Sequence, residues 1–348
     1  MSTTAARTRT PVGIMSAGMY VPDHFWTSAD LAAATGIPEE IIRTKFGLHR
    51  IPIPGPDDHT NQMGIWAAQD AIERAGIDPL DIDVVLCTTE EHKEWPLWTA
   101  GIKLAYDVGA RNAWAIDVQL RCSTSMPALK IAKALMLEDE RIDTVLIAGG
   151  YRNFDYVDRR NPRTTFMYGL AAGGGALLVR QGYPRNHVLE TATIVDGSYS
   201  LDVYVPVGGT VEPATPETVG GPRHKLDVLH PEEMKRRLND NSASNFLKVI
   251  DEALTRSGHT RADIGYLCIL HIKPSFHRYV MDELGLSDEQ TFYLHDYGHI
   301  GQQDQPISIV EGLRTGRLKD GDLMVMVGAG VGYAWAASVV KWGPLREL

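Results

Sequence analysis

The stretch AGIDPLDIDVVLC, residues 75–87, ends a helical pattern, makes a turn and enters a short apolar strand. A second stretch about 180 residues later, SGHTRADIGYLCI at 257–269, repeats this order of helix end, turn and strand. At a similar offset, ERIDTVLIAGG at 140–150 matches RLKDGDLMVMVGAG at 317–330. Two matching pairs with one offset predict a duplicated structural unit, although chance similarity between two ordinary helix–strand units is the alternative.

The strands of this unit are predicted by apolar, β-branched runs that are typical of strands covered on both faces. Helical patterns such as MGIWAAQDAIERAG separate them, so the sequence predicts a layered α/β fold built from two similar halves. We set these halves at 1–180 and 181–348, because TVEPATPETVGGPRH in the segment 180–230 is rich in Pro, Gly and Thr and is typical of a long surface loop. The predicted strand runs are VVLC, TVLIAGG, GYLCILH and LMVMVGAG.

Composition excludes several classes of protein. The 348 residues carry a net charge of −10, which argues against a nucleic-acid binder held by phosphate contacts. The first ten residues lack an apolar signal core and no later run is long enough to span a membrane, so we expect a cytoplasmic protein with a tail at its start. Three cysteines make no disulfide framework, and no Cys/His spacing is typical of a metal site.

Cys122 in VQLRCSTSMPALKIAKALM is the candidate nucleophile. Apolar residues recur at helical spacing after it, which places the cysteine at or near a helix N-terminus. Backbone N–H groups and the helix dipole at that end favour the reactive thiolate. Core packing is the alternative, since cysteine is often buried. For Cys87 and Cys268, inside apolar strand runs, we predict packing.

A nucleophilic cysteine needs a base or hydrogen-bond donor, usually distant in the sequence. His271 ends a buried strand in LCILHIKPSFHRYV, and strand ends are where α/β sheets present side chains to ligands. His295, Asp296 and His299 surround a glycine before another helix. A lone histidine is usually structural, but two in corresponding loops together with Cys122 form a candidate site.

These residues carry a family resemblance. Cys122 in RCSTSMPAL, His271 in LHIKPSFHRYVMDELGL, the YGHIGQQDQP loop and the ending GDLMVMVGAGVGYAWAASVVKW resemble the ketoacyl-ACP synthase III group of the thiolase superfamily over nearly the whole chain. The resemblance implies a five-layer αβαβα fold, with the nucleophile in the first half and the histidines in the second. It also implies a homodimer and acylation of Cys122 by an acyl thioester of coenzyme A or of an acyl or peptidyl carrier protein.

The resemblance further implies decarboxylative condensation of the acyl group with a malonyl-type donor. Carried over, His271 donates a hydrogen bond to the donor's thioester oxygen, and the backbone N–H groups of Cys122 and Val331 form the oxyanion hole. No cofactor is implied beyond the thioester substrates. FMYGLAAGGGALLV at 166–179 lacks the ending of a phosphate loop, so we predict no nucleotide cofactor.

One departure concerns His299, which stands where the family normally has Asn. Condensing relatives with a Cys-His-His arrangement keep decarboxylation reasonable, but relatives without the Asn include enzymes that only transfer the acyl group to an alcohol or amine. Asp296 could orient a histidine as the base for such an acceptor. Condensation, simple acyl transfer and a non-catalytic partner subunit therefore stay open, with condensation in specialised, polyketide-type biosynthesis as the leading prediction.

Two residues after the strand VVLC have alternative interpretations. Glu90 stands where thiolase-fold enzymes that deprotonate an acyl donor carry a glutamate, so it is a candidate general base, with a solvated acidic loop as the simpler reading. Trp95 matches an aromatic position that limits the acyl pocket across the dimer interface in the bacterial initiating enzymes. Packing at the interface is the alternative for its indole ring.

A last departure from the family pattern concerns the thioester donor. Ile41 aligns with a position where those enzymes often stack a tryptophan on coenzyme A, which favours a carrier protein as donor. Arg43 and Lys45 are candidate docking residues for such a carrier, or ordinary surface charges.

Overall fold

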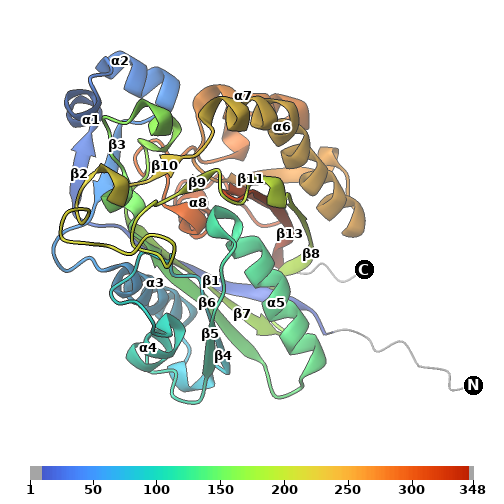
Figure 1. Cartoon of the computed structure of the whole chain (residues 1–348). Coiled ribbons are helices and arrows are strands. Elements are labelled where there is room, and N and C mark those ends of the chain that lie inside the picture. The colour runs from blue at the N-terminus through green and yellow to red at the C-terminus, as the bar shows by residue number, and fades with distance from the viewer. Residues whose placement is uncertain (1–9, 345–348) are drawn as a thin grey trace, which may run out of the picture.

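A computed structural model describes residues 10–344, so most of the tail predicted at the start of the chain lies outside the described residues. Its centre is one nine-stranded mixed sheet with the order β11-β12-β13-β8-β1-β7-β6-β4-β5 (Figure 1). The predicted mixed α/β architecture is confirmed. The strands of this sheet are β1 (Val12–Tyr20), β4 (Val84–Cys87), β5 (Trp114–Asp117), β6 (Thr144–Tyr151), β7 (Gly173–Gln181), β8 (Arg185–Val195), β11 (Ile264–Ile269), β12 (Leu323–Gly330) and β13 (Ala334–Pro344).

The strand order repeats within the sheet. β1-β7-β6-β4-β5 places the first strand of a five-strand set beside the fifth, then the fourth, second and third. β8-β13-β12-β11 follows the same sequence, and Thr291 takes the third-strand position through an isolated parallel bridge to Leu267. The two sets also share their orientations, parallel for β4–β6 and β11–β12 and antiparallel for β6–β7 and β12–β13.

The two strand sets meet at a single residue pair, Gly13 of β1 and His187 of β8. The predicted boundary at 180/181 falls at the end of β7, just before β8 begins at Arg185. Because one pair joins the sets, each set behaves as a layer with its own two faces.

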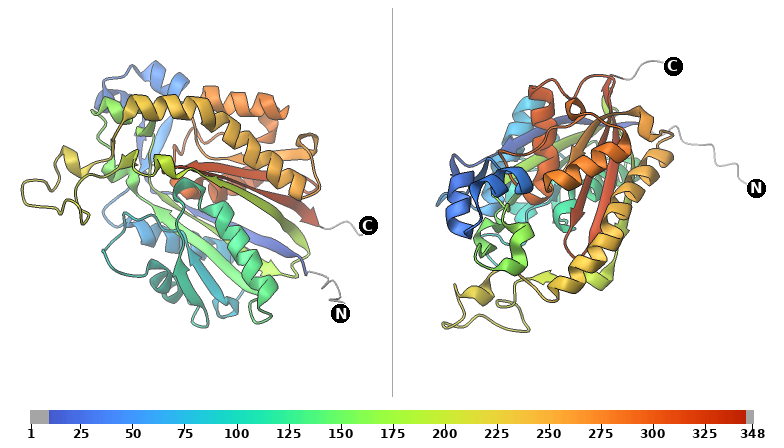
Figure 2. Two further views of the ribbon diagram at one scale, coloured as in Figure 1. Left: turned by 45° about the vertical axis from the view of Figure 1, so that its right-hand side comes forward. Right: turned by 90° about the horizontal axis from the view of Figure 1, so that it is seen from above.

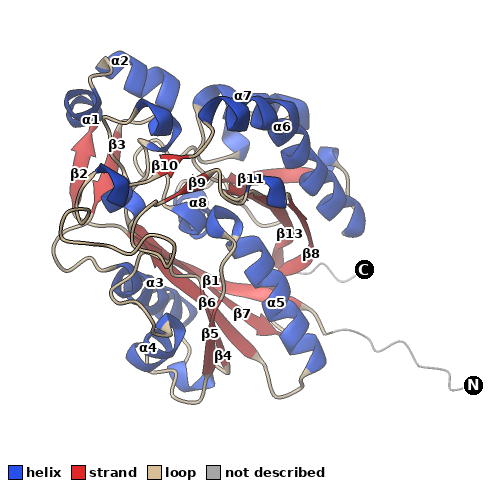
Figure 3. Cartoon of the chain, viewed as in Figure 1, coloured by secondary structure: helices blue, strands red, loops and turns tan. Residues whose placement is uncertain are grey.

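Helices fill the layers between and outside these sets. α5 contacts β6 and β7 of the first set and β8 and β13 of the second, and α8 likewise contacts strands of both. α3 and α4 cover the outer face of the first set and α6 that of the second, where residues of α7 join the same hydrophobic cluster (Figure 3). The helices are α1 (Ser28–Thr35), α2 (Glu39–Ile41), α3 (Thr60–Ala75), α4 (Ala100–Asp107), α5 (Ser125–Glu138), α6 (Pro231–Arg256), α7 (Pro274–Leu284) and α8 (Asp304–Arg314).

Three apolar clusters hold these layers together. One lies between α3, α4 and the first strand set, one between the two sets around α5 and α8, and one between the second set and α6 and α7. Burial of apolar surface is the main favourable term in folding, so each sheet face needs a helical cover. Five layers, αβαβα, follow from that requirement.

A fourth cluster lies under a cap beside the sheet, which includes the hairpin β2 (His24–Thr27) and β3 (Arg50–Ile53) and the π-helical turn η1 (Ile42–Phe46). The short pair β9 (Val203–Tyr204) and β10 (Asp227–Val228) flanks a long segment that extends away from the body, as expected for the predicted surface loop (Figure 2). Across residues 10–344, no helix has the length and apolar character that a membrane crossing requires.

Candidate active site

Cys122 lies in a single 3-10 turn, η3 (Arg121–Ser123), that runs into α5 at Ser125. The prediction that it precedes a helix is therefore confirmed. The preceding residue, Arg121, has a φ of 51°, in the left-handed region that non-glycine residues rarely adopt. This reversal lets a buried cysteine, only 8% exposed, follow an extended segment and begin a helix within three residues.

Hydrogen bonds fix this turn to both halves of the fold. The Ser123 hydroxyl donates to the Ala334 carbonyl of β13 at 3.0 Å, and the Ser125 hydroxyl donates to the Gln302 carbonyl at 2.5 Å. The Thr124 hydroxyl accepts the Leu120 N–H at 2.7 Å. Since the surrounding bonds over-determine the backbone, the strained residue before Cys122 can persist.

His299 contacts Cys122 and is oriented by an aspartate that the sequence analysis did not single out. Its Nδ1 lies 2.6 Å from Oδ2 of Asp304, which is fully buried. Burial alone would lower the pKa of His299, but the Asp304 carboxylate and the Cys122 thiolate, which also hydrogen-bonds the imidazole, raise that pKa well above its usual value. A protonated imidazole therefore lies between a carboxylate and the candidate nucleophile.

His271 is held in the opposite charge state. It follows the end of β11, and burial lowers its pKa to about 4, with an opposing effect from Asp304 and a further lowering by His299. Its Nε2 lies 3.4 Å from the Gly47 carbonyl and 3.4 Å from the Tyr293 hydroxyl. At neutral pH His271 is a neutral hydrogen-bonding group.

Asp304 connects these two histidines. Besides accepting from the His299 ring, its Oδ2 accepts the backbone N–H of His271 at 2.8 Å, and its Oδ1 accepts that of Ile300 at 2.7 Å. The carboxylate is the first residue of α8, so the dipole of that helix also favours its negative charge.

Asp296, which the sequence offered as the orienting residue, contacts neither histidine of the site. Its carboxylate lies 3.5 Å from His49 Nδ1 and 3.4 Å from His295 Nε2, in a partly exposed position. That part of the prediction is wrong, because the loop turns at Gly298 and carries Asp296 to the outer side. The sequence signal that could have found Asp304 is an acidic residue at the start of a helix, five residues after His299.

Glu90 is buried, with 2% of its surface exposed, so the interpretation as a solvated loop residue is wrong. Arg121 bridges it to Glu91, with Nη1 lying 2.5 Å from Glu90 Oε1 and Nη2 lying 2.6 Å from Glu91 Oε2. Since Arg121 directly precedes Cys122, this ion pair ties the segment after β4 to the cysteine turn. The role of Glu90 as a general base stays a prediction.

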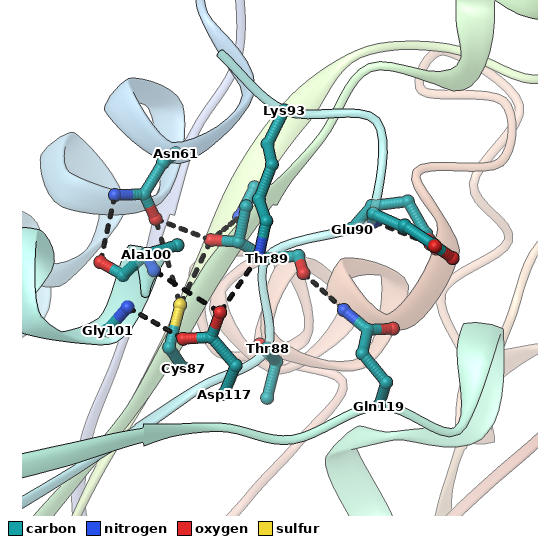
Figure 4. A network of polar contacts seen from close by, with 12 residues as sticks. Asn61, Cys87, Thr88, Thr89, Glu90, Lys93, Ala100, Gly101, Asp117 and Gln119 are labelled. Carbon is teal, nitrogen blue, oxygen red and sulfur yellow. Dashed lines mark hydrogen bonds and ion pairs between the residues drawn. The ribbon is translucent and has the colours of Figure 1, made fainter. Parts of the chain in front are cut away.

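A polar network holds the start of that segment (Figure 4). The Thr89 hydroxyl donates to the Asn61 side-chain oxygen at 2.7 Å, and the Cys87 thiol lies against both residues. Asp117 accepts Lys93 Nζ at 2.8 Å and the Gly101 N–H at 2.8 Å. Figure 4 shows the Glu90 carboxylate on the side of the segment away from this network.

The other two cysteines lie within strands of the sheet. Cys87 and Cys268 are fully buried in β4 and β11, and burial raises the pKa of each thiol to about 12. Their predicted role in packing fits this environment, because a thiol with so high a pKa carries no thiolate at neutral pH.

The end of β12 passes directly against the cysteine turn. A Cβ built on Gly330 would lie 3.1 Å from the Cys122 backbone nitrogen and 2.6 Å from the Leu120 carbonyl oxygen, so only glycine permits this approach. Val331 follows at once, and with Arg121 it lines a small cavity of about 250 Å³. The two N–H groups predicted for the oxyanion hole thus belong to backbone segments in contact.

The remaining predicted residues lie on the surface. Trp95 is 60% exposed and packs edge-on against Trp98 at 5.6 Å. Ile41, Arg43 and Lys45 are exposed on α2 and η1. Within the described chain, none of these side chains contacts Cys122, so a role at the acyl pocket requires a second subunit or a bound substrate.

Two family models match parts of the chain that contain residues of this site. Residues 116–197 match the family model "3-Oxoacyl-[acyl-carrier-protein (ACP)] synthase III", and residues 254–342 match "3-Oxoacyl-[acyl-carrier-protein (ACP)] synthase III C terminal". The first range contains Cys122, and the second contains both histidines and Asp304.

Relatives extend the match along the chain. The beta-ketoacyl-[acyl-carrier-protein] synthase III of Symbiobacterium thermophilum is 29% identical over 339 residues, covering 96% of this chain and 98% of that protein. The solved structure of the Thermus thermophilus synthase III superposes with a TM-score of 0.81 at 24% identity, over 96% of this chain and 100% of that one. The priming β-ketosynthase of the R1128 polyketide pathway superposes with a TM-score of 0.81 at 21% identity, over 99% and 100%.

Proposed function

The chain is a ketoacyl-ACP synthase III-like enzyme of the thiolase superfamily, and on that premise we propose that it condenses a Cys122-bound acyl group with a malonyl-type donor. The observation that carries the proposal is the buried line from Cys122 through His299 to Asp304, beside a neutral His271. A protonated His299 hydrogen-bonds the nucleophile, and a neutral donor is available for the second substrate.

In the first step the Cys122 sulfur attacks the carbonyl carbon of an acyl thioester. A carbon–sulfur bond to Cys122 forms, the bond to the carrier thiol breaks, and the proton held by His299 passes to the leaving thiolate. The backbone N–H groups of Cys122 and Val331 would bind the oxyanion of the tetrahedral intermediate. The close passage of Gly330 against the cysteine turn supports this assignment.

In the second step a malonyl-type thioester loses carbon dioxide. The carbon–carbon bond to the carboxylate breaks, and its electron pair forms an enolate on the thioester, which a hydrogen bond from neutral His271 stabilises. The enolate carbon attacks the acyl carbonyl, and Cys122 leaves as the thiolate. Burial of His271, which keeps its pKa near 4, supports its role as a neutral donor.

A second candidate function is transfer of the acyl group to a hydroxyl or amine without condensation. The His299–Asp304 pair favours it, because the pKa of His299 depends partly on the charge of Cys122. Acylation removes that charge, so the pKa of His299 falls and the imidazole can accept a proton from an attacking acceptor, with Asp304 holding its orientation. Carbon dioxide release separates this reaction from condensation.

We assign the reaction to specialised, polyketide-type biosynthesis rather than to fatty-acid initiation. His299 in place of Asn and Ile41 in place of a stacking tryptophan support this assignment. The exposed Arg43 and Lys45 beside Ile41 support an acyl or peptidyl carrier protein as a thioester donor.

We also propose a cytoplasmic homodimer. β5 lies at one edge of the sheet and exposes Trp114 and Ile116, and the adjoining α4 exposes Ile102 and Tyr106. An unpaired edge with apolar side chains favours pairing with a second copy. Trp95 lies in the loop before α4, where a partner's acyl pocket could receive it. All three cysteines are free, which fits a reducing compartment.

Intact-mass spectrometry tests the reaction. The protein and Cys122→Ala are incubated with acyl-CoA and acyl-carrier thioesters, followed by a malonyl donor. The proposal expects a Cys122-dependent acyl adduct that clears with carbon dioxide release and a ketoacyl product. An adduct that clears only with an alcohol or amine would establish acyl transfer instead, and the absence of any adduct would overturn the assignment of Cys122.

A further inference from the structure

His49, His295 and Asp296 gather outside the active site, at the junction of two segments that each lead to a catalytic histidine. His49 follows η1, and the other two precede His299. Their potential metal-ligating atoms all lie within 4.8 Å of one another. Within residues 10–344 this is the one trio of His, Cys, Asp or Glu that meets this condition.

The distances suit a small tetrahedral cation. His49 Nδ1 lies 3.5 Å from Asp296 Oδ1, and His295 Nε2 lies 3.4 Å from Asp296 Oδ2. Ligand atoms bound to tetrahedral Zn²⁺ at about 2.0–2.1 Å are about 3.3 Å apart. The two imidazoles meet edge-on with ring centres 4.3 Å apart, so a modest turn of the carboxylate would bring all three ligands onto one ion.

The surroundings prepare both imidazoles as ligands. The Nδ1 of His295 lies 3.0 Å from the Tyr293 carbonyl, to which it donates, so Nε2, on the side of Asp296, is the nitrogen that would bind the ion. Such an outer hydrogen bond is typical of histidines that bind metals. His49 likewise presents its Nδ1 to the Asp296 carboxylate, at 3.5 Å.

Charge and access decide which ligand fits. The Arg50 guanidinium lies 4.0 Å from Asp296, a weak contact, and also covers the Phe25 ring at 4.2 Å, while Arg43 lies near His49. These cations reduce the affinity for a metal without occupying the ligand atoms. Both histidines line a cleft of about 710 Å³, which leaves the fourth position of an ion open to water.

We propose that His49, His295 and Asp296 bind a Zn²⁺ ion, which links the turn at Gly47 to the loop that carries His299. A backbone hydrogen bond of 2.8 Å from the His49 N–H to the His295 carbonyl already joins these segments. The ion acts on the site through both segments. The Gly47 carbonyl faces His271, and His295 lies four residues before His299. His49 could not be paired with His295 and Asp296 from spacing, because the two segments lie far apart along the chain.

Zinc titration of tag-free protein tests the proposal, with Cys122→Ser as the background so that the active-site thiol cannot bind the ion. Competition with a chromophoric chelator should show one saturable ion per chain. At a free Zn²⁺ concentration of 100 times Kd, the thermal midpoint should rise by about 4 °C. The readouts do not depend on acylation, so failure of the proposed function leaves this test intact.

Variants locate the ion. Asp296→Asn and His49→Ala should each weaken binding at least about tenfold and so reduce the thermal shift at the same free zinc to about half or less, because each removes one of three ligands. His259→Ala is the matched control, since His259 also pairs with an aspartate, Asp263, at 3.7 Å on the surface. Asp296→Asn is close in shape to the native side chain, and circular dichroism verifies that it folds.

Three results would overturn the proposal. They are the absence of saturable binding at micromolar zinc, binding that Asp296→Asn leaves unchanged, and equal weakening in His259→Ala.

Discussion

His271 and His299 differ in which of their atoms meets the buried Asp304 carboxylate. His299 offers its ring, with Nδ1 at 2.6 Å, whereas His271 offers its backbone N–H at 2.8 Å. The carboxylate therefore raises the pKa of His299 strongly, while burial dominates at His271 and lowers its pKa to about 4. One carboxylate thus supports two histidines in opposite charge states, as a reaction with an activation step and an enolate step requires.

Removal of the Asp304 carboxylate should have the largest effect on the difference in charge state between His271 and His299. In Asp304→Asn the pKa of His299 falls, its support of Cys122 weakens, and acylation at pH 7 should slow about 10⁴-fold, as for a triad that loses its aspartate. Pre-steady-state acylation measured by mass spectrometry gives the rate. Asp263→Asn is the control, since this aspartate pairs with His259 on the surface, and it should stay within about threefold. Equal losses in both variants would contradict the role of Asp304.

His271→Ala should separate the two steps. The condensation rate should fall about 10²- to 10³-fold, because a donor to the enolate oxygen is lost, while acylation of Cys122 should change little. Single-turnover assays with and without the malonyl donor measure both rates. Equal slowing of both steps would mean that His271 supports the nucleophile rather than the enolate.

Two buried histidines should make the free energy of unfolding depend on pH. A histidine with a native pKa of about 4 and an ordinary unfolded value near 6.5 contributes its full stability above pH 6.5 and loses it as pH falls toward 4. His271 and His277 both have this native pKa. Each should contribute about 3 kcal/mol of pH-dependent stability across that window.

Urea unfolding at several pH values checks this dependence. His277→Phe should flatten the curve, because it removes the titrating ring, and its buried Nε2 has no hydrogen-bond partner to lose in the described structure. A slope that the variant leaves unchanged would contradict the assignment.

Glu90 gives the smallest expected effect. Glu90→Gln keeps the shape but leaves Arg121 with only Glu91, so the free energy of unfolding should fall by about 2 kcal/mol and condensation should slow less than about fivefold. Glu91→Gln is the matched control, since its carboxylate is exposed, and should change stability by less than about 0.5 kcal/mol. A loss of condensation above about 100-fold in Glu90→Gln alone would establish Glu90 as a general base instead.

Local patterns predicted the fold because each repeated unit carries its own helix end, turn and strand. VVLC and LMVMVGAG are strands in the structure, and Cys122 precedes its helix as the apolar spacing indicates. The candidate nucleophile and both histidines could be selected for the same reason, since each lies at a strand or helix end.

The partners of these residues could not be predicted in the same way. Asp296 is nearer to His299 along the chain, but the turn at Gly298 brings Asp304 to its ring instead. The pairing of Arg121 with Glu90 joins residues 31 positions apart and depends on how β4 and the cysteine turn pack. Such contacts arise from tertiary packing, which spacing in one sequence does not encode.

Acylation followed by a malonyl chase tests the central claim most directly. The wild-type protein and Cys122→Ala are loaded with an acyl thioester, and the adduct mass and labelled carbon dioxide are followed together. The account predicts an adduct on the wild-type protein alone, lost in step with one carbon dioxide per ketoacyl product. An adduct of equal size on Cys122→Ala, or its loss without carbon dioxide release, would contradict condensation on Cys122.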